Sequence, residues 1–304
     1  MLIALGGIAM IVVAAALLVR DRTGVLAGGD SATGVRAHRV RGDVAGVLCV
    51  VGGLLVALGA VSRFGYGRGQ LMAALPALVG SCLLAVFMTV EGTWPRQAGP
   101  VRTASVRARR LPDLDVGFLR GLVGLWAAGL VVAGIAFATV ASGPRQASRV
   151  LDDGRELVVT PFPGWWYGLP VLLAVAVLLG WGSVVIRLIL TRPAVEGLDD
   201  DRDLGLRRAS AGRVLGGLQL VLGLSLAAML AAGGRGLRIL GQGEGGTGSI
   251  AVAGPVEPGL VGAGGALMVL AVVVVVVAVV GCVLPMALRA AVAGAPRPRA
   301  ADAR

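Results

Sequence analysis

Long apolar runs alternate with short polar segments along the whole chain. A bilayer-spanning helix takes about 20 mostly apolar residues. Seven runs meet this length, at about residues 2–19, 44–62, 71–90, 117–141, 169–190, 214–232 and 260–286. The stretch AVVVVVVAVV at 271–280 has the composition of a strand, but backbone groups inside a bilayer must be hydrogen-bonded within their own segment, which favours a helix. The pattern predicts an all-α integral membrane protein of seven transmembrane helices, one helix followed by three hairpins.

The first run begins directly after Met1, and Arg20 and Arg22 follow it. A secretory signal has the opposite order, with its positive charges before the apolar core. We therefore expect an uncleaved first helix with its N-terminus outside. Residues 1–288 form a single polytopic domain in this interpretation, and 289–304, polar and rich in Pro, form a disordered basic tail in the cytoplasm.

The distribution of Arg supports this orientation. With the N-terminus outside, the inner loops are 20–43, 91–116, 191–213 and the tail from 287, and together they contain 19 Arg. The outer loops, 63–70, 142–168 and 233–259, contain 7. Inner loops of membrane proteins carry the excess of positive charge. The net charge of +11 is thus explained by topology, and no nucleic-acid partner is expected.

Composition narrows the chemistry further. Of the residues, 56% are hydrophobic, and all 28 basic residues are Arg, a bias typical of a GC-rich bacterial genome, so the bacterial cytoplasmic membrane is the expected location. Without Lys there is no Schiff base and no GxxxxGK nucleotide loop. His38 is the only His, and Cys49, Cys82 and Cys282 all lie in apolar runs. We expect no metal, no cofactor and no catalytic nucleophile, and therefore no enzyme activity.

Three of the predicted helices open with two Gly four residues apart. The motifs are GDVAG at 42–46, GFLRG at 117–121 and GRVLG at 212–216. Gly at this spacing gives a smooth face that allows close helix approach. Spans two, four and six are expected to pack through these six glycines: Gly42, Gly46, Gly117, Gly121, Gly212 and Gly216. Either a threefold duplication of a hairpin or Gly-lined packing without common ancestry explains the repeat, and the second is favoured.

The span centres carry no ionisable side chain, which argues against a carrier driven by its own ion gradient. The deepest polar residues are Gln219, Ser183, Ser225, Thr139 and Ser81. The segment GLDDDRDLGLRR, with carboxylates from Asp199 to Asp203, offers either a magnesium site or a solvated inner segment, and we favour the solvated segment.

Basic residues near the inner face are candidates for lipid or partner contacts. Four of them, Arg102, Arg107, Arg109 and Arg110, precede the fourth span. They suit anionic lipid or a cytoplasmic partner, although the topology signal alone also explains them. Arg187 either pairs with Glu91, binds a lipid phosphate or, as we favour, extends to the headgroups as an anchor.

The outer loops predict a small extracytoplasmic cap. Residues 149–159 have apolar arms around Asp152-Asp153-Gly154, a β-hairpin signal, and 238–254 suit a second, looser hairpin. Next comes TPFPGWWYGLP at 160–170. Trp165, Trp166 and Tyr167 are expected at headgroup level as interface anchors; the alternative is a lid with a ring turned towards a polar cavity.

Three functions fit these observations. The first is a non-catalytic membrane subunit of a transport system, a permease-like partner of a cytoplasmic ATPase or of another membrane subunit. The second is a structural or assembly protein of the bacterial envelope. The third, least favoured, is a membrane enzyme that acts on lipids through Asp199–Asp203 or the Arg clusters.

Overall fold

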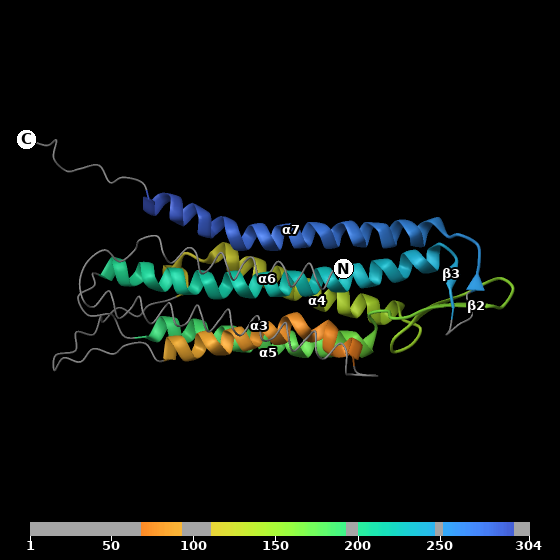
Figure 1. The fold of residues 1–304 in the computed structure, drawn as a ribbon, viewed down its shortest axis with the longest axis horizontal. Helices are drawn as coiled ribbons and strands as arrows, with labels where there is room; N and C mark the ends of the chain where they lie inside the picture. The colour runs from red at the N-terminus through yellow and green to blue at the C-terminus, as the bar shows by residue number, and fades with distance from the viewer. Residues whose placement is uncertain (1–67, 93–110, 193–199, 247–251, 295–304) are drawn as a thin grey trace, which may run out of the picture.

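The computed structural model describes residues 68–92, 111–192, 200–246 and 252–294, and this part of the chain is mostly helical. Its long helices lie side by side along the longest axis of the molecule, and the strands gather at one end (Figure 1). The predicted spans 2–19 and 44–62 lie outside the described residues. The helices are α3 (Arg68–Gly92), α4 (Gly117–Val140), α5 (Trp165–Thr191), α6 (Asp200–Gly241) and α7 (Pro258–Gly294), with a 3-10 turn, η1, at Leu111–Leu114.

Four of the described helices are long and apolar enough to cross a membrane. They correspond to Gly117–Val140, Trp165–Thr191, Asp203–Gly241 and Pro258–Val283. Large apolar side chains on their outer faces are exposed, among them Phe118 on α4 and Val269 on α7. In water such faces would be costly, whereas lipid accommodates them. The protein is therefore a helical membrane protein.

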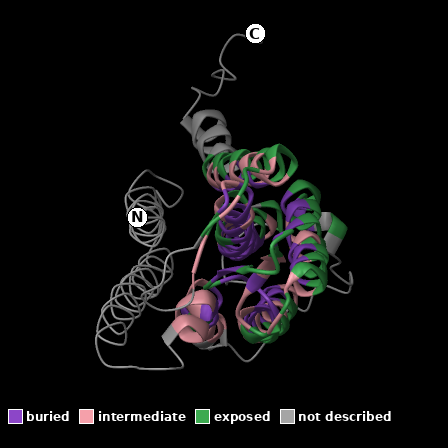
Figure 2. Ribbon diagram, turned by 90° about the vertical axis from the view of Figure 1, so that its right-hand side faces the viewer, coloured by how far each residue is buried: buried purple, intermediate pink, exposed green. Residues whose placement is uncertain are grey.

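Helix α6 lies at the centre of the described bundle. Of its apolar window, 83% is buried inside the protein, compared with 28% for those of α4 and α7. Figure 2 shows this helix enclosed by the others, whose outward faces are exposed. The prediction of a span at 214–232 was too short, because the helix continues over its polar first turns from Asp200 and on to Gly241. Asp200, Asp201 and Asp203 occupy its first turn, where carboxylates interact favourably with the helix dipole.

Helices α6 and α7 approach each other closely through glycines. A methyl group added at Gly234 would lie 2.7 Å from the carbonyl oxygen of Gly264, and one added at Gly241 would lie 2.6 Å from the amide nitrogen of Val261. Backbone therefore faces backbone along this contact, as small residues permit in membrane helices.

The glycines that open the predicted spans do not take part in this close contact between α6 and α7. Gly117 and Gly121 are exposed, and no described atom lies within 4 Å of an added Cβ at either position. Helix α4 instead meets α6 further along, where Gly129 faces Leu226. Gly212 and Gly216 are buried on α6, while Gly42 and Gly46 lie outside the described residues.

Two small hairpins form a cap at one end of the helices. Strands β1 (Ala147–Val150) and β2 (Glu156–Val159) pair antiparallel, which confirms the hairpin predicted at 149–159. The looser second hairpin pairs only β3 (Glu244–Gly245) with β4 (Val252–Ala253). The two hairpins join because the amide of Gly246 donates to the carbonyl of Val158 at 3.0 Å, and Arg149 forms a 3.1 Å ion pair with Glu257.

Candidate functional site: a buried charge cluster at one end of the helices

The end of the bundle opposite the cap contains four charged residues that are buried or nearly so. Helices α3 and α5 end here and α6 begins here (Figure 1). The side chains are those of Glu91, Arg192, Asp203 and Arg207, and we call them the charge cluster. Charged groups are almost never buried without partners, because loss of hydration costs several kcal/mol for each ion (about 20 by the idealised Born limit). Their pairing therefore determines whether this end of the molecule is stable.

Arg207 is the most buried of these groups, with a side chain 0% exposed. Its Nε donates to Oδ2 of Asp203, one turn earlier on α6, at 2.8 Å. Its other nitrogens donate to backbone carbonyls at the end of α5: those of Ile189 at 2.6 Å, Leu190 at 3.1 Å and Arg192 at 2.7 Å. The last carbonyls of a helix have no partner within the helix. Arg207 thus caps α5 from the neighbouring helix, and the positive charge also suits the negative end of its dipole.

Arg192, which follows α5 directly, is paired with Glu91 in the last turn of α3. Its Nη1 lies 3.1 Å from Oε2 of Glu91, and the two side chains are 1% and 9% exposed. Burial lowers the pKa of Arg192, an effect that the carboxylate of Glu91 opposes. The pair joins α3 to α5 as Arg207 joins α5 to α6.

One alternative and one interpretation made from the sequence change here. Glu91 pairs with Arg192 rather than with Arg187, which is exposed on α5; the favoured interpretation of Arg187 as an anchor is unaffected. The segment interpreted as solvated is instead the start of α6, with Asp203 and Arg207 buried. In the described residues no group of three or more His, Cys, Asp or Glu side chains is arranged to hold a metal ion. The candidate lipid contacts Arg102, Arg107, Arg109 and Arg110 lie outside the described residues.

A second polar site lies within the helices, at Gln219. This side chain is 0% exposed. Its Oε1 accepts from Nε1 of Trp126 on α4 at 3.2 Å, and its Nε2 donates to the carbonyl of Ala278 on α7 at 2.7 Å. The side-chain amide of Gln219 thereby connects α4, α6 and α7. Both its oxygen and its nitrogen have hydrogen-bond partners inside the protein. The sequence identified Gln219 as deep and polar, but the spacing along the chain gave no sign of its partner Trp126.

At the cap end, some aromatic side chains of the stretch 160–170 are exposed and others pack inside the protein. Trp165 is 59% exposed and Trp166 37%, at the first turn of α5, while Tyr167 is partly buried against Gly69. The guanidinium of Arg145 lies 5.3 Å from the Trp166 ring centre. The ring that turns inward is Phe162, which meets Phe137 edge to face at 5.7 Å. Phe162 therefore fills apolar space in the core rather than facing a polar cavity.

No family model, curated protein or solved structure matches the chain. The function must therefore be argued from the chain's own residues.

Proposed function

We propose that the protein is a non-catalytic membrane subunit associated with a transport system, the permease-like partner of an ATP-driven transporter. The observation that carries this proposal is the charge cluster, which ties α3, α5 and α6 together at the end where the Arg-rich segments leave the helices. A movement of a partner protein bound at this end would therefore be transmitted to α3, α5 and α6 together.

The length of α6 supports a contact surface outside the bilayer. The apolar window and its extension, Asp203–Gly241, contain 39 residues. At about 1.5 Å per residue this helix measures roughly 58 Å, compared with a hydrocarbon core of about 30 Å. Part of α6 must therefore extend beyond the core or tilt strongly. Its charged first turns, from Asp200 to Arg208, suit a position in the headgroups or in water.

The interior of the described helices supports a subunit that depends on a partner for energy. Gln219 is bonded on both sides to neighbouring helices, and Ser81 and Ser225 bond back to their own helix backbones. In the described spans no carboxylate, the usual carrier of a coupled proton or sodium ion, lies near the middle. An external energy source such as ATP hydrolysis fits this interior.

Co-purification tests the proposal. The protein extracted in mild detergent is expected to bring an ATPase with it, identified by mass spectrometry and by ATP hydrolysis in the eluate. Reversing the charge at the exposed positions Asp201 and Arg208 (Asp201→Arg, Arg208→Asp) should reduce ATPase recovery at least tenfold. The matched control is Arg235→Asp, an exposed change at the cap end of the same helix, which should leave recovery unchanged. If wild-type protein recovers no ATPase, or if all three variants behave alike, the proposal fails.

The second candidate, a structural or assembly protein of the envelope, is favoured by the cap. The cap exposes Val150, at the end of β1, and Val256, between β4 and α7, at 68% and 64%. Each is next in sequence to a member of the ion pair between Arg149 and Glu257. Exposed apolar side chains on a small cap suit a protein partner. Val150→Asp combined with Val256→Asp should then abolish cross-linking to envelope proteins without reducing ATPase recovery, an outcome that would separate the two functions.

A further inference from the structure

The described helices form two groups, each held together by its own contacts. Helices α3 and α5 are the first group. At the charge-cluster end they are joined by the ion pair between Glu91 and Arg192. At the cap end, Nε2 of Gln70 on α3 donates to the carbonyl of Trp166 on α5 at 2.8 Å. Because the two helices are joined at both ends, a movement of one carries the other with it.

Helices α4, α6 and α7 are the second group. The side-chain amide of Gln219 on α6 is bonded to Trp126 on α4 and to Ala278 on α7. Towards the cap, the backbones of α6 and α7 meet at Gly234 and Gly264. Buried hydrogen bonds and direct backbone contact leave these three helices little freedom to move past one another.

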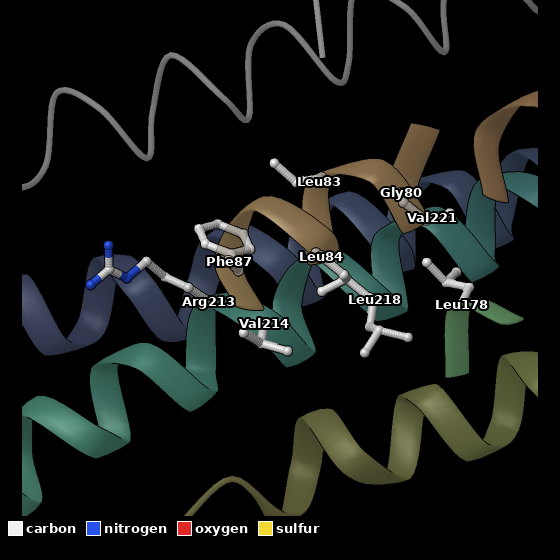
Figure 3. A pocket seen from close by; sticks show the side chains of 10 residues that line it. Gly80, Leu83, Leu84, Phe87, Leu178, Arg213, Val214, Leu218 and Val221 are labelled. Atoms are coloured by element: carbon white, nitrogen blue, oxygen red, sulfur yellow. The ribbon is translucent and has the colours of Figure 1, made fainter. Parts of the chain in front are cut away.

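The contact between the two groups is mainly apolar and is incompletely filled. A space of about 10 Å³, sufficient for roughly one water, lies between Phe87 of α3, Leu178 of α5 and Leu218 of α6 (Figure 3). Its lining is apolar except for Arg213 at one edge, so the lining side chains lose dispersion contacts across the space. Phe87 is one turn before Glu91, so this loosely packed part lies towards the charge-cluster end.

Arg207 connects the two groups at the charge-cluster end. It belongs to α6, and its guanidinium donates to three carbonyls at the end of α5. The ion pairs stay within the groups, because Glu91 and Arg192 belong to the first and Asp203 and Arg207 belong to the second. Separation of the groups here would therefore break hydrogen bonds to neutral carbonyls and leave both ion pairs intact. Neither pair would leave a buried charge uncompensated, which is the costly event in such clusters.

At the cap end the two groups remain joined by the chain itself. The segment from α4 to α5 folds into the β1–β2 hairpin, and the amide of Trp166 donates to the carbonyl of Pro144 at 3.1 Å. Phe162, just before α5, packs edge to face on Phe137 of α4, and a Cβ added at Gly236 of α6 would lie 2.7 Å from its ring. These contacts suit a hinge, because they hold the ends of helices from both groups in place.

We propose that α3 and α5 swing as one body away from α4, α6 and α7 at the charge-cluster end, with the cap end as the hinge and Arg207 as the latch. The described arrangement is the closed state. A partner that binds the end of α5 and takes over its last carbonyls opens the latch. The proposal concerns the movement of the helices, so it holds or fails whether or not that partner is an ATPase.

Spin-label distances in membranes test the movement. In a background with the three native cysteines replaced by Ala, labels at Phe118 and Thr191 report on α4 and α5 at the charge-cluster end, where both side chains are exposed. Arg207→Lys keeps a positive charge beside Asp203 but lacks the planar fork that reaches several carbonyls at once. It should lengthen the mean distance by several ångströms, whereas Arg208→Lys, the matched exposed change, should leave it unchanged.

Two further label pairs distinguish a swing from a general loss of packing. Val140 and Leu169 are exposed on α4 and α5 at the cap end. The native Cys82, retained for this pair, and Val184 are exposed on α3 and α5 within the first group. Both distances should stay the same in Arg207→Lys. If the distance at the charge-cluster end also stays the same, or if all three distances lengthen together, the proposal is overturned.

Thiol labelling tests the swing without any change at Arg207. Leu84, on the α3 side of the space, is 3% exposed, and Leu122, at a similar distance along α4 from the charge-cluster end, is 8% exposed. A cysteine at position 84 should react several times faster with a small water-soluble thiol reagent than one at position 122, although it is the more buried. The reason is that the swing uncovers the face of α3 but not the interior of the second group. Equal rates, or faster reaction at position 122, would exclude the swing.

Discussion

At the scale of single residues, Arg207 has the largest structural role among the charged side chains that the structure describes. It lies on α6, yet three of its four hydrogen bonds end on carbonyls at the end of α5. Because a side chain of α6 supplies these hydrogen bonds, the last carbonyls of α5 depend on α6 for their hydrogen-bond partners. The negative partner, Asp203, keeps the buried guanidinium from being uncompensated.

Replacing Arg207 should therefore be severe. Arg207→Met leaves Asp203 buried without its counter-charge and the α5 carbonyls without donors, and we expect a loss of about 3–5 kcal/mol in the free energy of unfolding. Asp203→Leu should cost less, because the guanidinium keeps its carbonyl partners, and the double variant should be more stable than Arg207→Met alone. Reversible unfolding in mixed micelles, followed by circular dichroism, measures the order.

The exposed neighbour Arg208 provides the control for that series. Arg208→Met should change the unfolding free energy by less than about 1 kcal/mol, as is usual for a substitution of an exposed side chain. If Arg207→Met also falls within that range, Arg207 does not hold α5 to α6 in the way its hydrogen bonds indicate.

The turn of the first hairpin supplies a prediction of pH dependence. The backbone amide of Arg155, and then its side chain, lower the pKa of Asp153 below its usual 3.8. A depressed carboxyl pKa stabilises the folded turn at pH values above 3.8, and this contribution disappears as the pH falls through the lower, folded value. The protection factor of the Arg155 amide, which is its intrinsic exchange rate at each pH divided by the observed rate, should therefore fall in the wild type as the pH drops below 3.8. Asp153→Asn should remove that acid dependence, whereas Asp152→Asn should retain it.

The sequence predicted the first hairpin correctly but did not predict the burial of Arg207. The hairpin at 149–159 followed from local turn chemistry, since Asp-Gly between apolar arms determines the turn by itself. Arg207 did not, because Asp203 and Arg207 one turn apart fit equally well a solvated helix face and a buried pair. Their burial depends on the end of α5, which is close in space but sixteen residues away along the chain.

At the scale of elements, apolar runs predicted where helices lie but not where they end. For α4, prediction and structure agree to one residue at the C-terminal end, since polar residues follow directly. For α6 they differ by fourteen residues at the start, because helix formation there depends on packing and on acidic residues in the first turn rather than on hydrophobicity. Close packing through Gly occurs where Gly234 meets Gly264, whereas Gly117 and Gly121 on α4 have no described atom within 4 Å of an added Cβ.

The contact between α6 and α7 gives a sharp test of glycine packing. Gly234→Ala places a methyl group against the carbonyl of Gly264, and we expect the helices to separate, with a loss of about 1–3 kcal/mol. Gly262→Ala on α7 meets no described atom within 4 Å, so it should leave stability unchanged or raise it by up to about 1 kcal/mol through a better helix propensity. Equal effects of the two substitutions would show that backbone approach does not limit this contact.

At the scale of the whole molecule, the two ends of the described bundle differ in character. One end carries the hairpins and the exposed Trp165 and Trp166. The other carries the charge cluster and is the end from which the Arg-rich segments leave (Figure 1). A bundle with such ends has only two ways to lie in a bilayer, and the excess of Arg at one end favours that end inside.

The different ends of the bundle allow its orientation in the membrane to be measured by labelling. In a background with all three native cysteines replaced by Ala, a cysteine at Gly154, in the turn of the first hairpin, should react with a membrane-impermeant maleimide in intact cells. A cysteine at Asp201, in the exposed first turn of α6, should react only after the membrane is opened by detergent. The reverse labelling would invert the molecule, place the cap in the cytoplasm and remove the basis for an ATPase at the charge cluster. Because both cysteines are exposed and at opposite ends of the described helices, a difference between them reports sidedness rather than burial.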